Sequence, residues 1–160
     1  MQIGERKAES LEQAADRVIE ESRMVLPGIQ AIFGFQLIAV FNARFENDLL
    51  PYERYIHLAA IALVAVSIAL IMAPAAFHRQ AEPGIISQYF VDLASRLLTT
   101  AMLPLLLAIA LEIFLVARLI VHDIGISIGI SAAVLALFAY LWIIFPRLSA
   151  KRRASRDSRQ

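Results

Sequence analysis

Residues 55–77 read YIHLAAIALVAVSIALIMAPAAF, and this stretch decides the fold. It contains no Asp, Glu, Lys or Arg, and His57 is its one side chain that titrates near neutral pH. A helix rises about 1.5 Å per residue, so a run of this length crosses the roughly 30 Å apolar core of a bilayer. We therefore predict a transmembrane helix over residues 55–77.

Three further apolar runs lie around it, at residues 26–43, 97–117 and 124–145. Pro27 falls in the first turn of its run, where a missing N–H costs nothing. The connections are short, which makes sequential helices antiparallel neighbours. The sequence predicts an all-α integral membrane protein, a four-helix bundle over residues 26–146.

The composition agrees with a protein whose solvent is lipid. Hydrophobic residues make up 59% of the chain and charged residues 18%, and Cys is absent. We find no serine–histidine–acid spacing, glycine-rich phosphate loop or paired-cysteine motif, so we expect no enzyme, no cofactor and no metal site.

The two ends of the chain are polar. Within residues 1–25, Leu11, Ala15, Val18 and Ile19 recur at helical spacing, which predicts an amphipathic helix at the membrane interface or under the bundle. Residues 147–160 form a basic tail, interpreted as a topology signal and a contact for anionic lipids. No folded module accompanies this tail, so we expect no nucleic-acid binding.

The distribution of Lys and Arg predicts the orientation. Twelve lie on the side of the termini and of the second connection, and three, namely Arg44, Arg54 and Arg118, lie on the other. Cytoplasmic segments are enriched in Lys and Arg, so both termini are expected in the cytoplasm.

Glu112 is the most informative single residue, because a carboxylate within an apolar span costs several kcal/mol unless it is paired, hydrated or protonated. The small residues Ala94, Ala101 and Ala108 share its side of the helix and predict that it faces the bundle. Two interpretations remain open: a cation or proton site, or an ion pair with Arg44 or Arg54.

Two weaker pore candidates accompany Glu112. Pro104 frees the carbonyl of Thr100 from its helical bond, which can line a binding site or simply produce a kink. Gln30 and Gln36 lie about 120° apart on the first span, so they cannot line one wall together. A filter role for Gln30 and interhelical hydrogen bonding by either amide both remain open.

Small residues also form continuous stripes on two spans, which predict close helix packing within one chain or between chains. The fourth span carries Gly125, Gly129, Ala132 and Ala136, and the second carries Ala62, Ala65, Ala69, Ala73 and Ala76. The three histidines are expected at the interfaces, in water.

Residues 21–79 also carry a family resemblance. The pieces LPG at 26–28, FGFQ at 33–36 and APAAFHR at 73–79 resemble a bacterial family of small four-span membrane proteins of unknown function. The resemblance covers about residues 20–146, and some members are labelled sodium–proton antiporters. It implies a bacterial inner-membrane location and provides no functional residues to transfer.

Two functions follow as expectations. The first is a small cation channel or ion-transport protein, most simply a homo-oligomer in the lipid bilayer. The alternative is a scaffold or accessory subunit bound to a larger membrane protein.

Overall fold

The computed structural model describes residues 10–83, 85–149 and 151, and for Arg44 and Glu46 it describes the backbone alone. The predictions for residues 1–9 and for most of the basic tail lie outside this range. The described chain is helical in every element: α1 (Leu11–Val40), α2 (Ala43–Asp48), α3 (Pro51–Ala81), α4 (Gln88–Val121) and α5 (Ile124–Ala139), which continues through a π-helical turn, η1 (Tyr140–Ile144).

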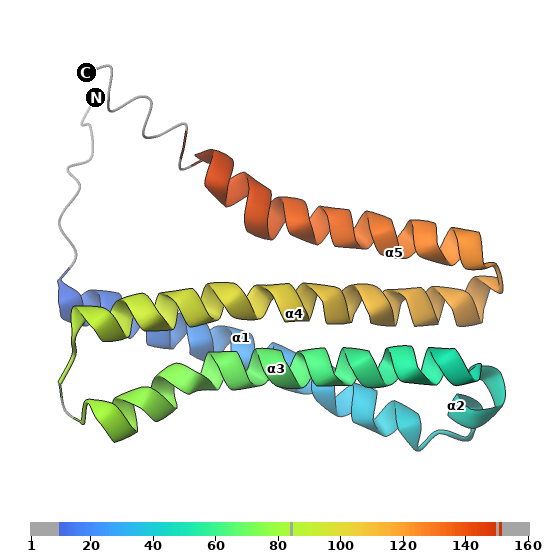
Figure 1. Cartoon of the computed structure of the whole chain (residues 1–160), viewed down its shortest axis with the longest axis horizontal. Coiled ribbons are helices and arrows are strands. Elements are labelled where there is room, and N and C mark those ends of the chain that lie inside the picture. The colour runs from blue at the N-terminus through green and yellow to red at the C-terminus, as the bar shows by residue number, and fades with distance from the viewer. Residues whose placement is uncertain (1–9, 84, 150, 152–160) are drawn as a thin grey trace.

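Figure 1 shows long helices that run alternately in opposite directions. Helix α4 is central, with α3 on one side and α5 on the other, and α1 crosses α3 and α4. Among the described residues, α1, α3, α4 and the helix Ile124–Ser149 are long and apolar enough to cross a membrane. The protein is therefore an all-α membrane protein with four candidate spans, as predicted.

Capping residues mark the helix ends at the turns where the chain reverses direction. His122 ends α4 in the left-handed conformation, with φ 60°, and the Asp123 side chain then accepts from the Ile126 N–H to cap α5. Ser87 caps α4 in the same way by accepting from Phe90 N–H. These caps turn the chain within a few residues and keep consecutive helices adjacent.

The seam between α3 and α4 is the most extensive contact between two helices of the described chain. Ala60, Val64 and Ser67 of α3 are buried, and so are Ala94, Ala101 and Ala108 of α4. Small side chains let the two backbones approach closely, which is the main source of helix association in lipid. The prediction that the alanine side of the third span faces the bundle is confirmed.

Helix α1 joins the predicted amphipathic segment and the first span in one continuous helix. Ser10 caps it, with Gln13 completing a reciprocal capping box. Its first turns bury Ala15 and Val18, and Ala15 clusters with Phe90 and Val91 of α4. The polar beginning of the helix therefore packs against the start of α4.

Helix α5 packs chiefly on α4, through one face. Ser127 is buried there, and the Ser131 hydroxyl donates to the Ala110 carbonyl at 2.7 Å. The predicted packing stripe Gly125, Gly129, Ala132 and Ala136 lies on the opposite face and is exposed. Most of the alanine stripe of α3 is exposed as well, so within one chain neither stripe forms the helix seam.

Candidate functional site

Three polar side chains from three different spans meet near the α2 end of the bundle. The Gln36 side-chain N–H of α1 donates to Glu112 Oε1 of α4 at 2.9 Å. The Nδ1 atom of His57, on α3, lies 2.9 Å from the same carboxylate oxygen. Gln36 and His57 are buried, 5% and 4% exposed. Glu112 is thus the common partner of two buried groups on two neighbouring helices.

The two contacts of the His57 ring require a proton in addition to that of a neutral imidazole. Its second ring nitrogen, Nε2, lies 3.0 Å from the backbone carbonyl of Gln36, which can only accept. Both nitrogens therefore face acceptors, whereas a neutral imidazole has one N–H. The two contacts are satisfied together only when His57 is an imidazolium or when Glu112 is protonated. In either form the Glu112–His57 pair is electrically neutral. It carries one proton more than a neutral imidazole beside an ionised carboxylate.

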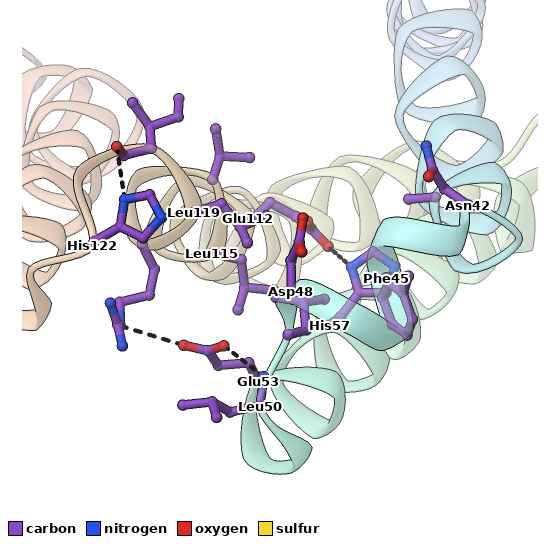
Figure 2. Close-up of a pocket in the computed structure, with 15 residues that line it drawn as sticks. Asn42, Phe45, Asp48, Leu50, Glu53, His57, Glu112, Leu115, Leu119 and His122 are labelled. Carbon is purple, nitrogen blue, oxygen red and sulfur yellow. Dashed lines mark hydrogen bonds and ion pairs between the residues drawn. The ribbon is translucent and has the colours of Figure 1, made fainter.

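Phe45 of α2 holds the His57 ring from the side, at 5.2 Å between centroids in an edge-on arrangement. Figure 2 shows Phe45 beside the His57 ring and Glu112 on the opposite side of that ring. The short helix α2 and the first turns of α3 together orient the imidazole. A buried ring with contacts on three sides has little freedom to rotate away from Glu112.

Glu112 also faces a pocket. Its side chain is 24% exposed, and both of its contacts end on Oε1, which leaves Oε2 without a partner among the described residues. The pocket has a volume of about 880 Å³ and lies between the ends of α1 and α4, helix α2 and the start of α3. Leu115, Val116 and Leu119 form part of its apolar wall. Ligands that enter the pocket can therefore reach one carboxylate oxygen.

A second ion pair lies at the same end. Glu53 Oε1 is 3.4 Å from Arg118 Nε, a distance at which the two charges attract without a formed hydrogen bond. Glu53 also accepts from the Leu50 N–H at 2.9 Å and so caps α3. At 3% exposed, it ties the first turn of α3 to the last turn of α4 (Figure 2). This pair closes one side of the pocket.

Towards the other end of the bundle the site is closed by apolar packing. One heptad from Gln36, His57 and Glu112 along their helices lie Ile29, Val64 and Leu105, all of them buried in one core cluster. Ala101 and Ala108 belong to the same cluster. The polar site is thus open to the pocket on one side and faces a packed apolar layer on the other.

The partners of Glu112 among the described side chains are Gln36 and His57 rather than Arg54. The side chain of Arg44 is outside the described part of the chain, and Arg54 donates to the Leu49 carbonyl at 3.2 Å. An arginine would have to reach inward from the helix ends, whereas His57 lies on the bundle face of α3 beside Glu112. Among the described side chains, Arg118 pairs with Glu53 at this end.

The two other pore candidates do not join this site within one chain. Gln30 is exposed on α1, and Thr100 is exposed on α4 with its hydroxyl bonded to the Arg96 carbonyl at 2.8 Å. The structure brings Gln36 rather than Gln30 to Glu112. Pro104 leaves α4 continuous from Gln88 to Val121.

The expectation that His57 lies in water is wrong, because its side chain is buried. The sequence contained a signal: His57 shares a helical face with Ala60, Val64 and Ser67, all of which the structure buries. This face differs from the alanine stripe of residues 62–76, for which the sequence predicts close packing. If the face that contains Ala60, Val64 and Ser67 had been taken as the packed one, His57 would have been predicted inside the bundle.

Four apolar helices around a buried acid–histidine pair define a small polytopic membrane protein with a polar site inside its bundle. The family model that matches residues 4–146 is that of a family of unknown function, DUF6328, and the chain belongs to this family. Comparison with curated proteins and with solved structures gives no match.

Proposed function

We propose that this protein is an ion-transport protein that binds a proton at the Glu112–His57 pair and exchanges it across the membrane. The observation that carries the proposal is the pair itself: two titratable side chains from adjacent spans lie 2.9 Å apart inside an apolar bundle, and the second ring nitrogen of His57 also faces an acceptor. Ionisable residues within spans are costly, and they commonly mark ion and proton pathways.

The surroundings of the pair support a site that changes its protonation. Gln36 Oε1 is buried without a donor among the described residues, although its amide N–H is used by Glu112. A buried acceptor left without a donor destabilises a fold, so its presence beside a titratable pair favours a role in holding a proton or cation.

The apolar layer on the far side favours a carrier over an open pore. The core cluster that contains Ile29, Val64 and Leu105 separates the pair from the end of the bundle at which α1 begins. A proton bound from the pocket would therefore cross only after the helices move, or along a path completed by a second chain. Either route makes Glu112 the group at which the proton is held.

Proton flux in liposomes tests this proposal. The purified protein, reconstituted in vesicles with an internal pH-sensitive dye and a clamped membrane potential, is expected to dissipate an imposed pH gradient. Glu112→Gln keeps the shape and removes the titratable group, so its flux should fall to that of empty vesicles. Glu20→Gln, an exposed position of α1, is the matched control and should behave as the unaltered chain. Absence of flux from the unaltered protein in proton, sodium and potassium gradients would exclude ion transport.

A second candidate function is that of an accessory subunit, and the exposed face of α5 favours it. Gly125, Gly129, Ala132 and Ala136 form a small-residue stripe on the side of α5 away from α4. Such stripes allow close approach of another helix, from a second copy or from a larger membrane protein. Both functions are compatible with a homo-oligomer.

Gly129→Leu tests whether another chain covers this face. A Cβ at Gly129 meets nothing within 4 Å, so we expect the folded single chain to tolerate leucine with unchanged stability. If another helix packs there, the assembled species should be lost in size-exclusion chromatography with light scattering. Gly28→Leu is the matched control, because a Cβ there also meets open space. An unchanged assembly in Gly129→Leu would mean that this stripe faces lipid.

A further inference from the structure

The pocket beside Glu112 has the character of a binding site for a particular chemical class. Its apolar wall includes Leu115, Val116, Leu119 and Ile120 of α4 and Leu49 and Leu50 of the connection before α3. Its volume of about 880 Å³ lies in the range of small-molecule sites. Walls of this kind accept a hydrocarbon or aromatic body of modest size.

Most of the polar side chains that line the pocket are titratable, and carboxylates outnumber guanidinium groups among the described ones. Among the described residues, the titratable ones that line it are Asp48 from α2, Glu53 and His57 from α3, Glu112 and Arg118 from α4, and His122 directly after α4. The Glu112–His57 pair is neutral and Arg118 is paired with Glu53, so the lining presents carboxylate oxygens but no guanidinium that lacks a carboxylate partner. The lining therefore favours a cation over an anion.

Glu112 supplies the anchoring atom for such a cation. Its Oε1 is occupied by Gln36 and His57, whereas its Oε2 has no partner among the described residues. Because Glu112 lines the pocket and is partly exposed, a donor in the pocket can reach this oxygen. A protonated amine provides both the N–H and the charge that a carboxylate oxygen binds most strongly.

We propose that the pocket binds amphiphilic organic ammonium ions, with the ammonium group on Glu112 Oε2 and the apolar body against the α4 wall. The inference rests on the proposed proton site and adds its substrate class. When the amine cation binds, the proton shared by Glu112 and His57 leaves to the solvent. The reactants, one ammonium ion and a neutral pair, and the products, one ammonium–carboxylate pair with neutral His57 and one free proton, balance in charge and in atoms.

The proton and the ammonium ion compete for the site, because the Glu112 carboxylate can neutralise only one of them at a time. An amine that enters from the pocket therefore displaces a proton from the same site. Exchange of this kind would make the site a proton-coupled organic-cation transporter.

Calorimetry with hexylammonium chloride tests this inference. The full chain is placed in nanodiscs of zwitterionic lipid, and heats from empty nanodiscs are subtracted to remove partitioning into lipid. We expect saturable binding, and titrations in two buffers of different ionisation enthalpy should show up to one proton released per amine bound. Hexanol has the same body and can donate its O–H to Glu112, but it has no charge, so it should bind at least about tenfold more weakly because the ammonium–carboxylate attraction is lost.

Two variants make the result decisive. Glu112→Gln should weaken hexylammonium at least about tenfold while Glu20→Gln leaves it unchanged. In the unaltered chain each added methylene of the amine should raise affinity about fourfold, and Leu119→Ser should reduce that increment. Leu119 is partly exposed, so this variant is expected to fold.

The outcomes separate this inference from the proposed function. Equal binding of hexanol and hexylammonium, no binding above empty nanodiscs, or full binding by a folded Glu112→Gln would overturn the organic-cation site. Proton flux that persists under any of these results would leave the proposed function standing. Amine binding with proton release but no proton flux, either in a pH gradient alone or with a hexylammonium gradient imposed across the vesicle, would reject transport and keep the binding site.

Discussion

His57→Phe is expected to lower the free energy of unfolding by about 3 kcal/mol, because it strands the Glu112 carboxylate inside the bundle. Phenylalanine keeps an aromatic ring, slightly larger than imidazole, beside Phe45, and it removes both nitrogens that face Glu112 and the Gln36 carbonyl. The value is at the lower end for a broken buried pair since Glu112 is partly exposed to the pocket. Reversible unfolding in mixed detergent micelles measures it.

A double-mutant cycle separates the pair from general damage to the core. Glu112→Leu alone leaves His57 and the Gln36 amide without their carboxylate partner, so it also destabilises. With both substitutions the stranded charge is gone, and the combined loss should be smaller than the sum of the single losses by about 1–3 kcal/mol. Strictly additive losses would mean that Glu112 and His57 do not interact in the folded bundle.

Ala108→Leu is expected to destabilise the bundle by about 1–3 kcal/mol or to prevent folding altogether. Ala108 is fully buried in the core cluster with Val64 and Ile71 of α3, at the seam between α3 and α4. Apolar side chains are as well solvated by lipid as by the bundle, so close packing dominates helix association. If leucine pushes α3 and α4 apart, its burial cannot compensate for the lost packing.

Ala59→Leu is the matched control for this seam. Ala59 lies on the exposed side of α3, so the same exchange adds the same side chain where nothing is displaced. The midpoint of unfolding should remain at that of the unaltered chain for Ala59→Leu and drop for Ala108→Leu. Equal midpoints for the two variants would contradict the assignment of the α3–α4 seam.

The limits of the hydropathy pattern are clearest at the helix ends. The predicted first span begins at residue 26, yet α1 begins at Leu11 and continues through it. Hydropathy detects the part of a helix that lies in lipid, whereas backbone hydrogen bonds and the Ser10 cap decide where the helix begins. The polar turns that extend beyond the apolar core are therefore invisible to a search for apolar runs.

The stripes of small residues show a second limit. The alanines of residues 94, 101 and 108 face the bundle as predicted, but most of those on α3 and the Gly–Ala stripe of α5 face outwards. Small apolar side chains are as acceptable next to lipid as next to another helix. Composition therefore locates surfaces that can pack, and the rotation of each helix about its axis selects the surface that does.

The sequence by itself determined that the chain has four helices long and apolar enough to cross a membrane and that Glu112 faces the bundle. Apolar runs of this length must satisfy every backbone N–H and C=O internally, and only a helix does so in lipid. The tertiary structure alone decided that His57 and Gln36 are the partners of Glu112. Residues 36, 57 and 112 lie on three separate helices, and their meeting depends on how far each helix is shifted and rotated against the others. Those shifts are set by side-chain packing between helices, which no pattern along a single segment records.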